Sequence, residues 1–170
     1  MKTSILRAFL FSLIVFFILN FLFTFIGNAI YQSLDYEITR FGDHPTFVLF
    51  RLMFPIHWYP WVLIDRIIVT LEVGIRIMYI GYFISIVIAS IISGLFGGSV
   101  VKSVGGWILT SITCMLLFAL IILIDDYNGG FFCSGCTSGE AIIFMTIPVL
   151  INLMIFSALT ALIALIKGRS

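Results

Sequence analysis

Charged residues are scarce in this 170-residue chain. Asp, Glu, Lys and Arg together make up 10% of it, whereas soluble domains carry roughly 25%. Residues 103–124 and 141–166 contain no charged residue at all. Hydrophobic residues account for 62% of the sequence. This shortage of charge excludes a soluble domain, and a net charge of only +1 argues against nucleic acid as a partner.

Cysteine is also rare, with three copies in the chain. Three cysteines exclude a disulfide-rich scaffold and a zinc site built from four cysteines of one chain. The sequence has no glycine-rich phosphate loop, no His-Glu-x-x-His helix and no Ser-His-Asp set. The one local pattern with a known reactivity is Cys133-x-x-Cys136, in the polar connection between the two uncharged stretches.

Long apolar runs dominate what is present. A helix of about 20 apolar residues crosses the hydrocarbon core of a bilayer. The sequence predicts four spans within a single membrane domain of residues 1–170, at 8–31, 74–98, 104–124 and 141–166. A signal peptide is the alternative for the first run, but that run is longer than the roughly 7–15 residues of a signal core. The predicted fold class is all-α: a polytopic membrane protein with four transmembrane helices.

The outer segment 32–73 between the first two spans is rich in aromatic residues. They recur at spacings of three and four, at Phe47, Phe50, Phe54, Trp58 and Trp61. Pro55 and Pro60 interrupt any regular helix, and rings with a polar edge favour headgroup depth. We therefore expect an interfacial broken helix, with a ligand or lipid pocket beneath it and a re-entrant segment as the alternatives.

A helical pattern runs from Trp61 through Phe96, continuous with the second span. Within it, Glu72 stands four residues before Arg76, a spacing that predicts an ion pair on the helix surface.

Small residues line the end of the second span in two rows with a four-residue repeat. The rows are Ala89, Ser93 and Gly97, and Ser90, Gly94 and Gly98. In lipid, helices associate through close backbone approach over small residues and through hydrogen bonds between helices. The rows predict a helix-packing face, used either within one bundle or against a partner chain.

Two asparagines stand near the middle of their spans, Asn20 in the first and Asn152 in the fourth. The two spans run in opposite directions, so these amides are placed at a similar depth, where a side-chain hydrogen bond joins helices. No span carries a deeply placed Asp, Glu, Lys, Arg or His, the residues that mark ion and proton pathways. Transport is therefore disfavoured.

The distribution of charge predicts the orientation. With four spans, one side of the membrane collects basic residues only: Lys2, Arg7, Lys102, Lys167 and Arg169. All the acidic residues fall on the other side. Because basic residues near span ends are retained in the cytoplasm, we predict a multi-pass protein of the cell or plasma (inner) membrane with both termini cytoplasmic.

Around its cysteine pair the chain resembles the four-helix quinone-linked thiol oxidoreductases of the DsbB and vitamin K epoxide reductase type. The resemblance covers Phe132-Cys133-Ser134-Gly135-Cys136 and the number of spans. It implies that Cys133 and Cys136 are catalytic and that quinone is the cofactor, with His57, Trp58 and Trp61 as a candidate pocket. Those families use a second cysteine pair in an outer loop, and residues 32–73 contain no cysteine.

Two other interpretations of the cysteine pair stay open. One is a structural disulfide or a free thiol pair in a glycine-rich turn. The other is a zinc site that combines Cys133 and Cys136 with His44 and His57, which are ligand types that zinc accepts.

The sequence as a whole favours a non-enzymatic subunit or assembly partner of a larger membrane complex. The expected partners are other membrane protein subunits or a second copy of this chain, together with lipid. The alternative function is an outward-facing quinone-linked thiol-disulfide oxidoreductase that uses Cys133 and Cys136.

Overall fold

A computed structural model describes residues 4–31, 39, 42–43, 46–124 and 137–168, and this part of the chain contains helices and no strand. The helices are α1 (Ile5–Tyr31), α3 (Thr46–Met53), the 3-10 helix η1 (Phe54–His57), α4 (Pro60–Val69), α5 (Val73–Gly97), α6 (Val100–Ile124) and α8 (Ser138–Gly168). Four of them, α1, α5, α6 and α8, are long and apolar enough to cross a membrane. The prediction of an all-helical, multi-pass protein is confirmed to this extent.

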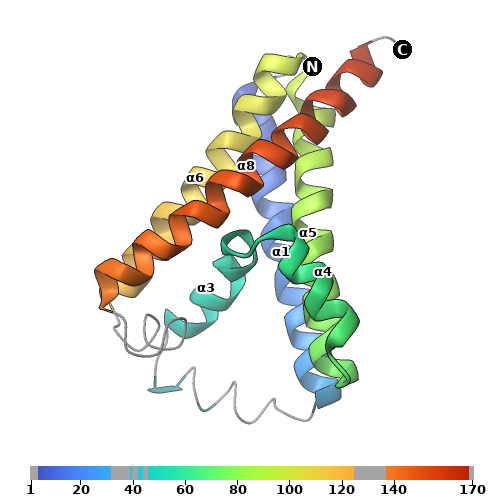
Figure 1. Cartoon of the computed structure of the whole chain (residues 1–170). Coiled ribbons are helices and arrows are strands. Elements are labelled where there is room, and N and C mark those ends of the chain that lie inside the picture. Colours follow the sequence, from blue (N-terminus) through green and yellow to red (C-terminus); the bar gives the residue numbers. More distant parts are fainter. Residues whose placement is uncertain (1–3, 32–38, 40–41, 44–45, 125–136, 169–170) are drawn as a thin grey trace.

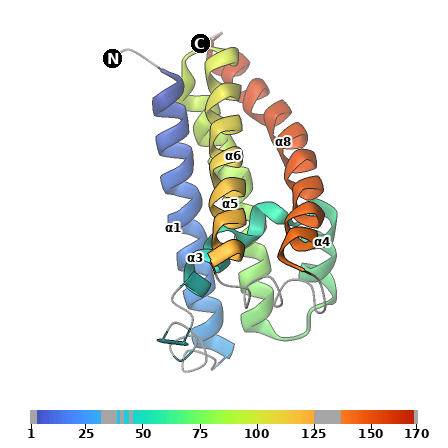
Figure 2. The same cartoon turned by 90° about the vertical axis from the view of Figure 1, so that its left-hand side faces the viewer.

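The four long helices form two pairs that diverge from one end of the molecule. In Figure 1, α1 lies beside α5 and α6 beside α8, and the pairs separate away from the chain termini. The N- and C-terminal ends of the described chain lie at the end where the helices converge (Figures 1 and 2). We call this the closed end and the opposite one the splayed end.

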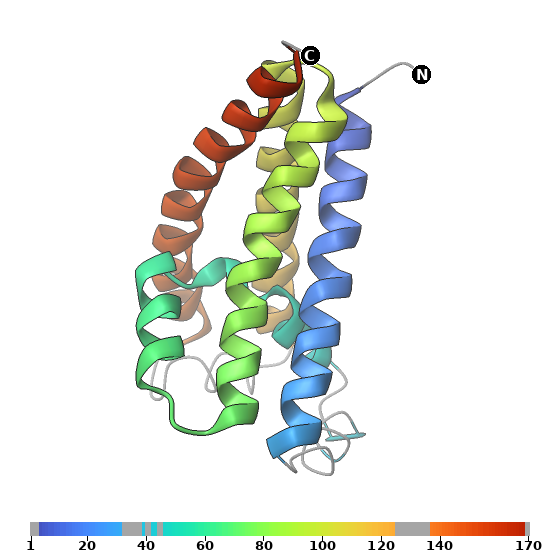
Figure 3. The ribbon, with the colours of Figure 1, turned by 90° about the vertical axis from the view of Figure 1, so that its right-hand side faces the viewer.

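Residues 46–69 form an inserted segment at the splayed end, in which α3 and η1 lie between the two helix pairs and α4 packs against α5 (Figures 1 and 3). This inserted segment comprises α3, η1 and α4, with η1 at its apex, and Figures 1 to 3 place it in the half of the molecule away from the termini. Its helix is broken around Pro55 and Pro60, as expected from two residues that lack a backbone N–H. The interfacial position expected for it is not confirmed.

The pattern that predicts one helix from Trp61 through Phe96 is interrupted in the structure. Thr70, Leu71 and Glu72 form an extended link between α4 and α5. The Arg76 guanidinium reaches back to the Thr70 carbonyl, to which Nε donates at 2.8 Å. Glu72 is the N-cap of α5 rather than a residue within the helix, and the guanidinium of Arg76 is engaged with the Thr70 carbonyl.

The closed end contains a tight turn between α5 and α6. Gly98 ends α5 with φ 77°, a left-handed conformation that glycine adopts without steric cost. The backbone N–H of Ser103 then donates to the Ser99 carbonyl at 2.9 Å, so α6 begins at Val100 rather than at 104. Lys102 therefore belongs to the first turn of α6.

Helix α8 starts at a capping box and contains one proline. Thr137 N–H donates to Glu140 Oε2 at 2.9 Å, and Glu140 N–H donates to Thr137 Oγ1 at 3.3 Å, which satisfies two donors at the helix start. Pro148 lies inside the helix and cannot donate a backbone hydrogen bond.

Candidate functional site

The apex of the inserted segment is held by the two mid-span asparagines. Asn152 Nδ2 donates to the carbonyls of Ile56 and Trp58, both at 2.7 Å, and Asn20 Nδ2 donates to the Leu52 carbonyl at 3.0 Å. Both asparagine side chains are fully buried. Each amide therefore binds backbone of the inserted segment, which is a partner that their spacing in the sequence did not predict.

The proline at the start of α4 explains why Asn152 finds a free carbonyl there. In a continuous helix the carbonyl of Ile56 would accept from the N–H of residue 60, but Pro60 has none. Buried carbonyl groups need a partner, and leaving one unpaired costs about 1–3 kcal/mol. The Asn152 amide, contributed from the middle of α8, supplies the missing donor.

His57 occupies the centre of this apex. Its side chain is 2% exposed and its ring centroid lies 3.9 Å from that of Phe118 on α6. Neither ring nitrogen has a hydrogen bond of normal geometry among the described residues. Burial in this apolar site disfavours the charged form of the imidazole, and the backbone of Met145 on α8 lies nearby. Near neutral pH the imidazole is uncharged.

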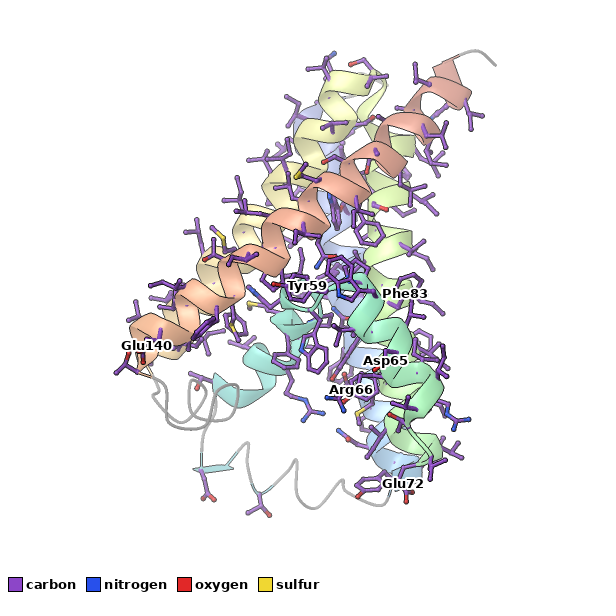
Figure 4. All side chains as sticks on the ribbon, viewed as in Figure 1. Tyr59, Asp65, Arg66, Glu72, Phe83 and Glu140 are labelled. Carbon is purple, nitrogen blue, oxygen red and sulfur yellow. The ribbon has the colours of Figure 1, made fainter. Side chains whose placement is uncertain are left out.

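The three residues of the candidate quinone pocket point in different directions. His57 packs on α6, whereas Trp58 contacts Phe54 and Tyr79 at centroid distances of 5.5 and 5.9 Å. Trp61 is 54% exposed and stacks on Tyr59 at 4.8 Å. Figure 4 shows Tyr59 near the apex and Asp65 and Arg66 further along α4. His57, Trp58 and Trp61 thus each contact different neighbours.

The predicted packing rows lie on the face of α5 that meets α8 and α6. Thr160 Oγ1 of α8 donates to the Ser90 carbonyl at 3.0 Å, and a Cβ added to Gly94 would lie 2.8 Å from Ile163 Cβ. Ser93 Oγ donates to the Ser103 carbonyl of α6 at 2.7 Å. The buried members of the rows are Ala89, Ser90, Ser93, Gly94 and Gly97, and Gly98 is exposed in the turn.

Two further contacts of this kind were not predicted from the sequence. Gly27 of α1 meets Gly74 of α5 so closely that a Cβ on either would overlap the other backbone. Thr110 Oγ1 of α6 lies 3.1 Å from Ser12 Oγ of α1. A search for small residues across all four spans, rather than for repeated rows within one span, could have found both.

An apolar groove lies between α1 and α3. Its volume is about 350 Å³, and it is lined by Phe17, Ile18, Phe21, Leu22 and Leu52. Its lining offers no polar group to orient a ligand.

The cysteine site falls outside the part of the chain that the structure describes. Cys133, Cys136 and His44 all lie there, so the disulfide, redox and zinc interpretations stay predictions. Cys114 is described, and it is a buried free thiol on α6. Among the described residues no group of three or more His, Cys, Asp and Glu side chains is placed to hold a metal ion.

Taken together, these observations define a helical, multi-pass membrane protein by composition, with a broken helical segment inserted between two helix pairs. No known protein family, curated protein or solved structure matches this chain.

Proposed function

We propose that this protein is a non-enzymatic subunit or assembly partner of a larger membrane complex. The observation that carries the proposal is the use made of the buried polar side chains. Within the described chain they are hydroxyls, amides and one imidazole, without a buried Asp, Glu, Lys or Arg. Several of them donate to backbone carbonyls of neighbouring elements, as Asn20, Asn152 and Thr160 do. Polar groups engaged in this way hold helices together.

Purification in mild detergent, with mass spectrometry of what travels along, tests this proposal. We expect the tagged chain to migrate well above the mass of one 19.1 kDa chain in its detergent micelle, with the same membrane proteins recovered in repeated preparations. Recovery of the chain alone, as a monomer, would contradict the proposal.

The inserted segment is proposed to be re-entrant: it enters the membrane between the helix pairs and leaves on the same side. Its apex bonds to Asn20 and Asn152, which stand near the middle of α1 and α8. Backbone that is broken at membrane depth is tolerated where it is enclosed by protein. These contacts support the re-entrant alternative over a position at the membrane interface.

Both termini are proposed to face the cytoplasm of a cell or plasma (inner) membrane, because the side that they share is basic. Leu71, which precedes α5, and Val101, in the first turn of α6, are 86% and 79% exposed. In a background with the native cysteines replaced by serine, a membrane-impermeant maleimide applied to intact cells should label Leu71→Cys and not Val101→Cys. Permeabilised cells should label both, and the reverse pattern in intact cells would reject this orientation.

The alternative function, a quinone-linked thiol oxidoreductase, rests on Cys133 and Cys136. The double variant Cys133→Ser, Cys136→Ser distinguishes the two proposals. A structural pair predicts that the variant still inserts and joins its complex, with a loss of about 2 kcal/mol at most from loop closure. Purified parent protein that reduces added quinone at the expense of a dithiol, with no such activity in the variant, would establish the oxidoreductase instead.

A further inference from the structure

The inserted segment joins parts of the bundle that pack on different neighbours. Helix α1 packs on α5 and α6, and α8 packs on the same two helices from another side. The segment receives one side-chain hydrogen bond from α1 and two from α8, all between neutral amides and carbonyls. Hydrogen bonds of this kind contribute modestly to the stability of membrane bundles. They act together with the apolar contacts of the segment and with Arg51, which donates to Met78 Sδ of α5 at 3.5 Å.

His57 belongs to η1, the part of the inserted segment that packs against several other helices. Elements α3, α5, α6 and α8 all pack against η1. The ionisable side chains that they carry are Arg51 on α3, Arg76, Tyr79 and Tyr82 on α5, Lys102 and Cys114 on α6, and Glu140 and Lys167 on α8. Glu140 is the one carboxylate among them.

Glu140 is not placed to stabilise a charged imidazole. It lies in the first turn of α8, where it forms the capping box with Thr137. Met145, whose backbone lies near His57, is five residues further on, about 7.5 Å along the helix axis. Among the described residues, a proton on the docked His57 would thus place a cation in an apolar site without an anionic partner, which is strongly unfavourable.

The link between α4 and α5 provides a hinge for release of the inserted segment. Thr70, Leu71 and Glu72 are extended, and Leu71 is 86% exposed. The link is anchored to α5 by Arg76, which binds the Thr70 carbonyl. Rotation about this link moves α4 while α5 keeps its place against α1.

We propose that the inserted segment is an acid-sensitive element, in which protonation of His57 releases residues 46–69 from between the two helix pairs. Released, the imidazole gains water and keeps its proton, and Asn20 and Asn152 lose their carbonyl partners. The device operates whether or not the chain is a complex subunit, because it depends only on contacts within this chain.

The sign of the pH dependence follows from the two states of His57. A hydrated, released imidazole has the ordinary pKa of about 6.5, whereas the docked site excludes water and disfavours the charged form. Docking is therefore unaffected by His57 well above pH 6.5, and it weakens progressively as pH falls below that value. Between pH 7.5 and 5.0 this linkage raises the released fraction about 30-fold.

Labelling of a buried position measures this release directly. Ile56, next to His57, is fully buried, so Ile56→Cys reacts with a maleimide only when the segment has left its site. The variant is prepared in nanodiscs with the three native cysteines replaced by serine. Its labelling rate is divided by that of Leu71→Cys at each pH, because thiol reactivity itself depends on pH. We expect the ratio to rise about 30-fold from pH 7.5 to 5.0.

The two histidines of the chain provide a matched pair of variants. His57→Gln should abolish the rise, because an amide does not titrate, whereas His44→Gln should retain it. An equal rise in His57→Gln, or a constant ratio in the parent, would overturn the proposal.

A second measurement serves in case His57→Gln docks poorly at every pH. In the His44→Gln protein, His57 is the sole histidine, so NMR of a labelled imidazole reports its charge alone. We expect the charged signal to appear over the same pH range as the labelling. Protonation of His57 without increased labelling of Ile56→Cys would contradict the proposal, as would an equal rise in the His57→Gln variant.

Discussion

The two helix pairs contact each other by different means at the closed end and at the splayed end of the bundle. At the closed end, glycines and serines let helix backbones touch, as where Gly94 meets Ile163 and Thr160 bonds to Ser90. At the splayed end the helix pairs are separated by another piece of chain, whose aromatic rings and backbone carbonyls make the contacts. Close backbone contact leaves little room for rearrangement. A docked segment, in contrast, can leave as a unit while the helices around it stay paired.

This contrast predicts that added volume is damaging where α5 meets α8 at the closed end. Gly94→Leu places its side chain against Ile163 and the backbone of Thr160, and overpacking of this kind costs about 1–3 kcal/mol or more. Gly139→Leu is the matched control, since no atom lies within 4 Å of a Cβ at Gly139. Thermal unfolding in detergent should show a clear loss for Gly94→Leu and a much smaller change for the control. Equal melting of the two variants would mean that this contact does not stabilise the bundle.

Loss of the amide at the apex should have the next largest effect, confined to the splayed end. Asn152→Leu removes the donor to two carbonyls, and Asn20→Leu removes the donor to one. Each buried group left unpaired costs about 1–3 kcal/mol. Hydrogen exchange should accelerate across residues 46–69 in both variants, more so in Asn152→Leu, while the rate around Ser90 to Gly97 stays unchanged. Faster exchange at both ends would show that the two regions are not independent.

The smallest effect is expected from a single hydroxyl at the closed end. Thr160→Val keeps the side-chain volume and removes the hydrogen bond to the Ser90 carbonyl. Such bonds in membrane bundles average about 0.6 kcal/mol. Steric trapping in bilayers or chemical unfolding in detergent should resolve a loss of this order in the free energy of unfolding, well below the loss in Gly94→Leu. A loss as large as that of Gly94→Leu would show that hydrogen bonding, rather than shape, dominates this end.

Sequence reasoning predicted what depends on local composition. The four spans follow from uncharged length, and the broken helix follows from Pro55 and Pro60. Helix ends were less accurate, because the turn at Gly98 and the capping box of Thr137 and Glu140 extend α6 and α8 beyond their uncharged cores.

The contacts of the inserted segment with α1 and α8 were not predicted, and the reason is physical. Aromatic residues with polar edges suit both headgroup depth and the inside of a bundle, so Trp58 and its neighbours did not distinguish the two. The contacts with α8 join residues about a hundred positions apart, with Asn152 replacing the N–H that Pro60 lacks. Neither Asn152 nor Pro60 is distinctive in the sequence, because their relation exists only in the folded chain.

The three tryptophans of the chain lie in three different environments. Trp107 is fully buried and meets Phe156 edge-on at 6.2 Å, Trp58 is half-buried within the inserted segment, and Trp61 faces outwards from α4. Indole emission shifts with the polarity of its surroundings, so proteins that retain one tryptophan each would report on three places by wavelength alone. The chain thus carries three fluorescent probes: Trp107 in the core of the bundle, Trp58 within the inserted segment and Trp61 on the outer surface of that segment.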